Sequence, residues 1–171
     1  SVLSELLLNI ISDAENYGRT EIGNNKRALV EFVSANPTGP LTVGHGRGAM
    51  LGDTVSNILE WNGYDVQREY YFNNAGRQMR VLGESVHARY LELLGETSEL
   101  PEGGYEGKYI YEIAQKIIDI HTDSLKDNSE EPIFKNSAES HIFEDIKSTL
   151  SRLGLVFDTF YNENTLYENG G

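Results

Sequence analysis

Residues 31–52 read EFVSANPTGPLTVGHGRGAMLG, and this stretch decides the fold. It opens inside an apolar, β-branched run, residues 28–34, which predicts a buried strand with one carboxylate, Glu31, set into it. A loop with two prolines follows, and a helix is expected from Gly44 to about Asn62. Strand, loop and helix in this order form the first half of a unit that builds parallel sheets.

Apolar periodicity and turn residues predict the other elements. Further helices are expected at 1–16, 75–94, 109–125 and 137–153, and further strands at 65–72 and 155–161. This order predicts an α/β fold, a doubly wound, Rossmann-like parallel sheet with a helical insertion between its second and third strands. The expected division is an N-terminal helix and linker (1–26), the first part of the nucleotide-binding domain (27–79), the insertion (80–154), and a third strand with a truncated tail (155–171).

Composition limits the class of protein. The chain has 171 residues, a formal net charge of −13 and no cysteine, which excludes disulfides and thiolate metal sites. No apolar run approaches the length of a membrane span, so we expect a soluble, cytoplasmic protein without membrane contact. No basic patch is evident, and any RNA contact must therefore be local or come from other parts of a longer protein. The absence of a start methionine at Ser1 suggests an excised segment.

The loop and the start of the following helix form the expected ligand site. In a parallel sheet they lie at the carboxyl edge of the strands, where ligands bind. Free N–H groups and the helix dipole favour an anion there, most naturally phosphate. Gly44, Gly46 and Gly48 leave room for a phosphate chain or a flat ring, and His45 in the first turn can bind an anionic oxygen.

A dinucleotide-binding fingerprint is the main alternative interpretation, because residues 44–49 match G-x-G-x-x-A. That fingerprint requires its first glycine directly after the strand, whereas residues 34–43 intervene here. It also requires an acidic residue at the carboxyl end of the second strand, and Asp65 lies at its start. Both features disfavour this alternative.

Three segments carry a family resemblance. Residues 35–45 (ANPTGPLTVGH) with the following Gly-Arg-Gly, residues 68–78 (REYYFNNAGRQ) and residues 153–158 (LGLVFD) resemble the arginyl branch of the class I aminoacyl-tRNA synthetases. The resemblance implies that arginine and ATP form arginyl-adenylate, and that the arginyl group then passes to tRNA. It also implies that this chain is a fragment of the catalytic domain, lacks the family's second, lysine-and-serine-rich signature, and is inactive alone.

The resemblance also implies residue roles. Gly39, Pro40, Thr42, Gly44 and His45 are expected at ATP, with His45 and Thr42 as catalytic residues. Glu31, Ser34, Asn36 and His45 are expected at arginine, where a carboxylate suits the guanidinium. Thr42 departs from the family pattern H-x-G-H, because a neutral hydroxyl replaces the first histidine. The full motif is Ala35, Asn36, Pro37, Thr38, Gly39, Pro40, Leu41, Thr42, Val43, Gly44 and His45.

The implied cofactor is ATP with Mg²⁺ as a substrate complex, without a dedicated protein metal site. The implied partners are arginine and the tRNA specific for arginine, which is bound mostly outside this chain. The complete protein is expected to be monomeric.

Structural interpretations stand beside these roles. Glu31 could pair with a basic group, Asn36 could be an ordinary turn residue, and His45 could simply begin a helix. His87, His121 and His141 are expected to be structural, and Arg77 and Gln78 either line the site or cap a helix. A stand-alone nucleotidyltransferase and a non-catalytic binding module remain as alternatives from other classes.

Overall fold

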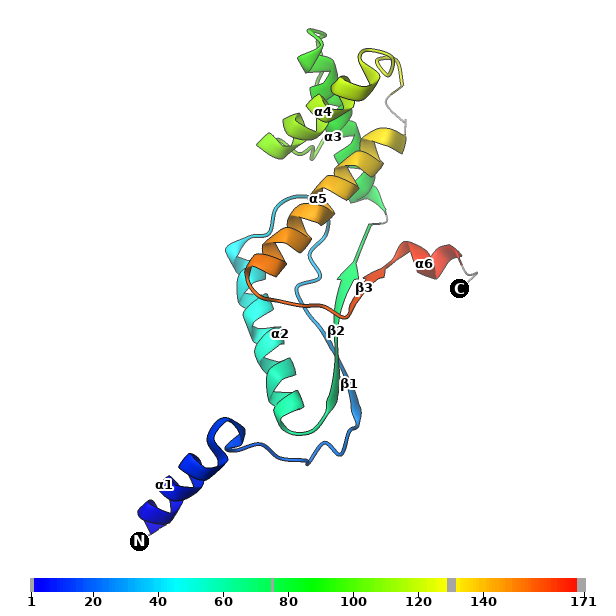
Figure 1. The fold of residues 1–171 in the computed structure, drawn as a ribbon. Helices are drawn as coiled ribbons and strands as arrows, with labels where there is room; N and C mark the ends of the chain where they lie inside the picture. The colour runs from blue at the N-terminus through cyan, green and yellow to red at the C-terminus, as the bar shows by residue number, and fades with distance from the viewer. Residues whose placement is uncertain (1, 75, 129–131, 169–171) are drawn as a thin grey trace.

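The computed structural model describes residues 2–74, 76–128 and 132–168. Its elements follow the expected order (Figure 1). They are α1 (Val2–Asp13), a 3-10 turn η1 (Ala14–Asn16), β1 (Arg27–Glu31), α2 (Val43–Trp61), β2 (Asp65–Phe72), α3 (Arg77–Leu93), α4 (Lys108–His121), α5 (Pro132–Arg152), β3 (Thr159–Asn162) and α6 (Asn164–Glu168).

The three strands form one parallel sheet in the order β1-β2-β3. Glu31 lies opposite Glu69, and β2 continues for three more residues, where it pairs with β3 as far as Asn162. The predicted α/β fold with a parallel sheet is confirmed, and α3, α4 and α5 form the predicted helical block between the second and third strands. The carboxyl ends of the strands point toward this block (Figure 1).

Helices α2 and α5 pack on the same face of the sheet. Gly52 of α2 lies against Phe32, because a Cβ there would be 2.2 Å from the Phe32 ring. On α5, the ring of Phe143 lies 4.1 Å from that of Phe72. The opposite face borders a hollow of about 590 Å³. This hollow is lined by Arg27, Ala28, Leu29, Asp65, Val66, Gln67, Glu69, Asp158 and Thr159.

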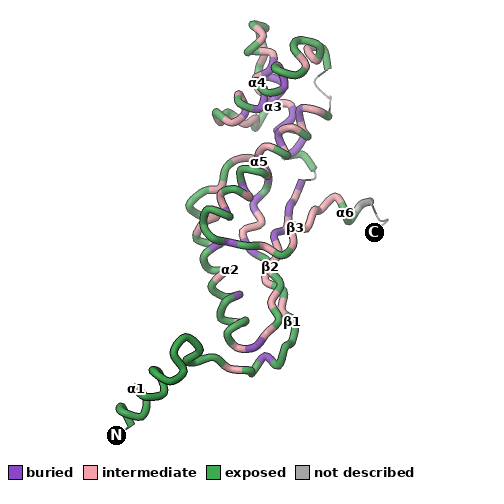
Figure 2. Tube along the Cα trace, in the orientation of Figure 1, coloured by how far each residue is buried: buried purple, intermediate pink, exposed green. Residues whose placement is uncertain are grey.

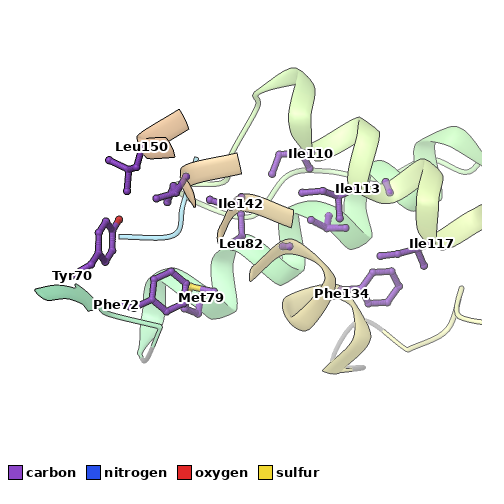
Figure 3. Close-up of a cluster of buried hydrophobic side chains, with 14 of the residues drawn as sticks. Tyr70, Phe72, Met79, Leu82, Ile110, Ile113, Ile117, Phe134, Ile142 and Leu150 are labelled. Carbon is purple, nitrogen blue, oxygen red and sulfur yellow. The ribbon is translucent and has the colours of Figure 1, made fainter. Parts of the chain in front are cut away.

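A continuous apolar core joins the helical block to the sheet (Figure 3). Ile110 and Ile113 of α4 are almost fully buried, as the amphipathic pattern of this helix predicts. The remaining labelled side chains of the core are Tyr70, Phe72, Met79, Leu82, Ile117, Phe134, Ile142 and Leu150. The core therefore extends from the sheet into the helical block.

The first strand differs from the prediction. It ends at Glu31, not at Ser34, and it is not buried throughout, because Leu29 is 58% exposed and Glu31 is exposed. β1 is an edge strand of the described sheet, and helices cover only the side that carries Phe32. An apolar run therefore predicted a strand correctly but not its burial.

Several element boundaries also differ. α5 begins at Pro132 and not at Ser137. Proline fits the first turn of a helix, because a backbone N–H at that position would have no partner within the helix. β3 begins at Thr159 and not at Leu155. α4 ends before Thr122, whose φ of +52° is left-handed, rather than at Leu125. Part of the expected irregular tail, residues 164–168, is helical; the rest of that tail, 169–171, lies outside the described residues.

The N-terminal helix is exposed along its whole length (Figure 2). The expected helix through Asn16 ends at Asp13 and continues as the η1 turn. Its apolar face, with Leu3 77% and Ile11 65% exposed, points into solvent. Within residues 2–74, 76–128 and 132–168, no helix has both the length and the apolar character to cross a membrane.

Candidate functional site at the carboxyl edge of the sheet

The predicted site lies where β1 ends and α2 begins. Residues 32–42 connect the two elements at the carboxyl edge of the sheet, beside the helical block (Figure 1). Side-chain hydrogen bonds divide the candidate residues into three groups along this loop, around Glu31, Asn36 and His45.

The first group is Glu31 with Ser34. The chain turns away from the sheet at Val33 and Ser34, which have left-handed φ angles of +66° and +39°. This turn brings the Ser34 hydroxyl back to donate a hydrogen bond to the Glu31 carboxylate. The same hydroxyl oxygen accepts the Tyr71 N–H at 3.1 Å, in place of a strand carbonyl. Glu31 is thus an exposed carboxylate held by a neutral donor, a state suited to binding a cation.

The second group is Asn36 with Gln78. The Asn36 side-chain amide donates to the Gln78 Oε1 at 2.9 Å. Gln78 lies in the first turn of α3, directly after the exit of β2, so both residues reach the same edge of the sheet. The sequence left Gln78 undecided between lining the site and capping a helix. Its position after a parallel strand was the available signal, because such exits gather at one edge.

The third group is Thr42 with His45. Thr42 is the N-cap of α2, and its backbone N–H donates to the His45 Nδ1 at 3.0 Å. The Thr42 hydroxyl also lies 3.3 Å from that nitrogen. Since Nδ1 acts as acceptor, the neutral ring carries its proton on Nε2, which is free to donate to an anion. Both residues therefore have a capping role, and His45 keeps a second ring nitrogen for chemistry.

The first turns of α2 leave open space. A Cβ built on Gly46 or Gly48 would meet nothing within 4 Å, and one on Gly44 would meet only the Thr42 hydroxyl at 3.6 Å. None of the three has a left-handed φ, so neither the backbone nor packing within the described residues requires glycine. Close approach by a ligand, or by another part of a longer chain, would require it.

Two tyrosine hydroxyls hold the loop from outside. Buried Tyr70 donates to the Ala35 carbonyl at 2.9 Å, and Tyr109 of α4 donates to the Thr38 carbonyl at 2.5 Å. Burial raises the pKa of both hydroxyls, so they remain protonated donors. Tyr70 lies in the predicted strand 65–72, which by itself indicates only packing in the sheet, and Tyr109 begins the predicted helix 109–125 without a further indicated role. The Tyr109 contact spans 71 residues, and no local pattern predicts it.

The remaining histidines lie on the helical block, and His141 lines the same hollow as Pro40 of the loop. His87 is buried, with its ring 4.8 Å from that of Phe134 and its Nε2 near the Lys126 carbonyl. Burial, and secondarily the Lys116 ammonium, lower the pKa of His141. The part of the chain that the structure describes contains no cluster of three or more His, Asp or Glu side chains suited to a metal ion. Arg77, the other undecided residue, is exposed at the start of α3.

Comparisons with known proteins point to one family. Residues 6–147 match the family model described as tRNA synthetases class I (R), catalytic domain. The chain is 56% identical to the arginine–tRNA ligase of Desulfotalea psychrophila over 165 residues, and 54% identical to that of Chlorobaculum parvum over 159 residues. The two matches include 96% and 93% of this chain but only 30% and 29% of the two relatives. The chain therefore spans about a third of their length.

A solved structure gives the same result for the fold. The crystal structure of a Campylobacter jejuni protein named as an arginyl-tRNA synthetase superimposes with a TM-score of 0.81 at 33% identity. The superposition covers 98% of this chain and 37% of that one. The fold of nearly the whole chain therefore occurs in an experimentally determined relative.

Proposed function

Because the chain belongs to the catalytic-domain family of the arginine-specific class I tRNA synthetases, we propose that it carries the ATP-binding loop and part of the arginine site of an arginine–tRNA ligase. In the complete ligase, meaning the whole enzyme that contains this segment, arginine and ATP form arginyl-adenylate and pyrophosphate. The arginyl group then passes to the tRNA specific for arginine.

The observation that carries the proposal is the exposed Glu31 carboxylate, held at the carboxyl edge of the sheet by the Ser34 hydroxyl. A guanidinium prefers a carboxylate because two N–H donors can meet its two oxygens. Ser34 engages one Glu31 oxygen, Oε1, and leaves the other, Oε2, without a bond from that hydroxyl. Asn36, already oriented by Gln78, would contact the backbone portion of the amino acid.

The same loop would bind the triphosphate. The N-terminus of α2 offers free backbone N–H groups and the positive end of the helix dipole. The Nε2–H of His45 would donate to the charge that develops on phosphate when the arginine carboxylate attacks the α-phosphorus. Thr42 would act mainly by holding the His45 ring, and Gly39, Pro40 and Gly44 would let the nucleotide approach closely.

Other parts of the proposal rest on the class of reaction. Mg²⁺ would arrive bound to ATP as substrate, neutralising phosphate charge. The ligase would act as a monomer in the cytoplasm, where aminoacyl-tRNA is used, and most of its tRNA contacts would lie outside this acidic segment. Residues 27–79 would form the first part of the nucleotide-binding domain, preceded by a helix and linker (1–26). The helical insertion (80–154) and the segment 155–171 would follow.

Substitution of Glu31 tests the proposal. In the complete ligase, Glu31→Gln should raise the KM for arginine about ten- to a hundredfold and leave the KM for ATP nearly unchanged, because a charge-assisted pair is lost. Arginine-dependent ATP–pyrophosphate exchange with the cognate tRNA present measures both constants. Glu144→Gln, which removes an exposed carboxylate bound to Lys147, is the matched control and should change neither. Equal losses for arginine and ATP would show that Glu31 is structural.

A further inference from the structure

The ring of Tyr109 links the inserted helices to the ATP-binding loop. Tyr109 is the second residue of α4, and its hydroxyl donates to the Thr38 carbonyl at 2.5 Å. The neighbouring residue, Ile110, is completely buried in the core that unites α3, α4 and α5. The hydroxyl is therefore attached to a tightly packed group of helices, whereas its acceptor belongs to a loop.

Two glycines fit around this ring. A Cβ on Gly39 would lie 3.2 Å from the Tyr109 hydroxyl oxygen and 3.4 Å from Cζ. A Cβ on Gly107, just before α4, would lie 2.2 Å from the Tyr109 Cε1. Neither glycine has a left-handed φ, and at both positions a side chain would meet this ring. The ring position is thus defined from the loop and from its own helix.

The contact lies close to the residues that would bind ATP. Thr38 and Gly39 precede Pro40, and two residues later Thr42 caps α2 and holds His45. Pro40 and Tyr109 also share the wall of a hollow of about 380 Å³ between the loop and the helical block. A shift of the Thr38 carbonyl would move the backbone that leads to the helix N-terminus, and errors of about 1 Å in such positions are costly for catalysis.

We infer that Tyr109 is a positioning residue for arginine activation: it acts through the Thr38–Pro40 segment to place the ATP-binding loop, without touching substrate itself. This inference rests on the proposed function. It gives the inserted helices a role in nucleotide binding, because their packing sets where the hydroxyl lies. Arginine recognition at Glu31 and Ser34, on the strand side of the loop, should be insensitive to this contact.

The test is kinetic analysis of variants of the complete ligase. Tyr109→Phe should raise the KM for ATP and lower kcat for pyrophosphate exchange, together by about three- to tenfold, as expected for one lost neutral hydrogen bond, with the KM for arginine unchanged. Tyr111→Phe is the matched control: its hydroxyl, on the same helix, donates to Glu92 at the surface, and its loss should leave the kinetics unchanged. Thermal unfolding checks that both variants are folded.

A double-mutant cycle separates positioning from general damage. Gly39→Ala alone should impair ATP use, because its methyl group meets the Tyr109 hydroxyl. In the Tyr109→Phe background the methyl group has room, so Gly39→Ala should cost clearly less than in the unsubstituted ligase. The inference would be overturned if the effects of Tyr109→Phe and Gly39→Ala were independent and multiplied. It would also be overturned if the Tyr109→Phe enzyme were as active as Tyr111→Phe. Neither result would affect the proposed function. A ligase without arginine-dependent exchange before any substitution would overturn the proposed function and the inference with it.

Discussion

Val33 and Ser34 hold left-handed backbone angles in succession, which is uncommon for residues other than glycine and unfavourable for a β-branched valine. Such angles cost on the order of 1–3 kcal/mol each and persist only where the surroundings hold them. Here the Ser34 hydroxyl bonds Glu31 and the Tyr71 N–H and lies 3.4 Å from the Phe32 carbonyl, and the Ser34 N–H donates to the same carbonyl at 3.0 Å. At the residue scale, this strained turn after β1 places the Ser34 hydroxyl where it can hold the Glu31 carboxylate.

Ser34→Ala should therefore act on arginine first. The variant leaves the Glu31 carboxylate without its donor and the Tyr71 N–H without its acceptor. We expect the KM for arginine to rise about three- to tenfold in the complete ligase, with little change for ATP. Ser56→Ala is the control, since the buried Ser56 hydroxyl bonds only within α2 to the Gly52 carbonyl and lies far along the helix from the loop. A larger change in the KM for ATP than for arginine would contradict this role.

His45 and Thr42 should prove unequal. His45→Ala removes the proposed donor to phosphate and should lower kcat of adenylate formation about a hundred- to a thousandfold. Thr42→Ala keeps the backbone N–H that orients the His45 ring and loses only the hydroxyl, so about a tenfold loss is expected. Pre-steady-state adenylate formation with tRNA present separates the chemical step from product release. Equal losses would make the Thr42 hydroxyl a principal donor.

At the scale of elements, α2 combines an open N-terminus with a packed middle. Gly46 faces open space, whereas the Phe32 side chain occupies the space beside Gly52. Gly46→Ala should raise the free energy of unfolding of the 171-residue chain by about 0.5–1 kcal/mol, because alanine favours the helix, yet raise the KM for ATP in the complete ligase. Chemical denaturation and exchange kinetics measure the two effects.

Gly52→Ala provides the opposite case on the same helix. A methyl group there would overlap the Phe32 ring and should lower the free energy of unfolding by about 1–3 kcal/mol. If Gly46→Ala stabilised the chain without any effect on ATP kinetics, the open face of α2 would not be next to the nucleotide.

The C-terminal half of α2 is fixed to β2 by Arg68. Its guanidinium bonds Glu60 at 2.6 Å and Asn57 at 2.7 Å, and the hydrogen bond from Arg68 lowers the pKa of Glu60. A lowered folded-state pKa stabilises the fold above the ordinary value of 4.5, and this contribution is lost as pH falls through the lowered value. Glu60→Gln should therefore lower the thermal unfolding midpoint at pH 7, and this effect should shrink as the pH falls below 4.5 and through the lowered pKa. A difference that is independent of pH would exclude this ion pair as its cause.

At the scale of the whole molecule, the chain leaves large apolar side chains in solvent. The outer side of α2 exposes 66% of Leu51 and 56% of Ile58, and on the bare side of the sheet Leu29 is 58% exposed. Exposed apolar surfaces of this extent usually mark contact with another protein part. The curated relatives are about three times as long as this chain, which provides a source for such a part.

The isolated chain should fold around its core but show no arginine-dependent pyrophosphate exchange with cognate tRNA supplied, because only part of the proposed site is present. It should also bind a hydrophobic dye more strongly than an equal molar amount of the complete ligase. The complete ligase serves as the positive control for exchange. Clear turnover by the isolated chain would refute the expectation that residues outside it are needed for catalysis.

The sequence by itself determined the α/β class, the parallel order of the strands, the helical block and the position of the loop. These follow from local information: β-branched runs, helical periodicity, and proline and glycine at fixed offsets. Residues 65–72 were located as a strand to the residue. The family resemblance in residues 35–45 likewise implies roles for Glu31, Asn36 and His45.

Only the tertiary structure decided where β1 ends, which face of the strand no helix covers, and which hydrogen bonds fix the loop at residues 32–42. The bonds from Asn36 to Gln78, from Tyr70 to Ala35 and from Tyr109 to Thr38 join residues 35 to 71 positions apart. Such pairs depend on how the helical block packs against the sheet. Periodicity reports which face of an element is apolar, but it carries no information about which distant hydroxyl or amide that packing will bring to a given carbonyl.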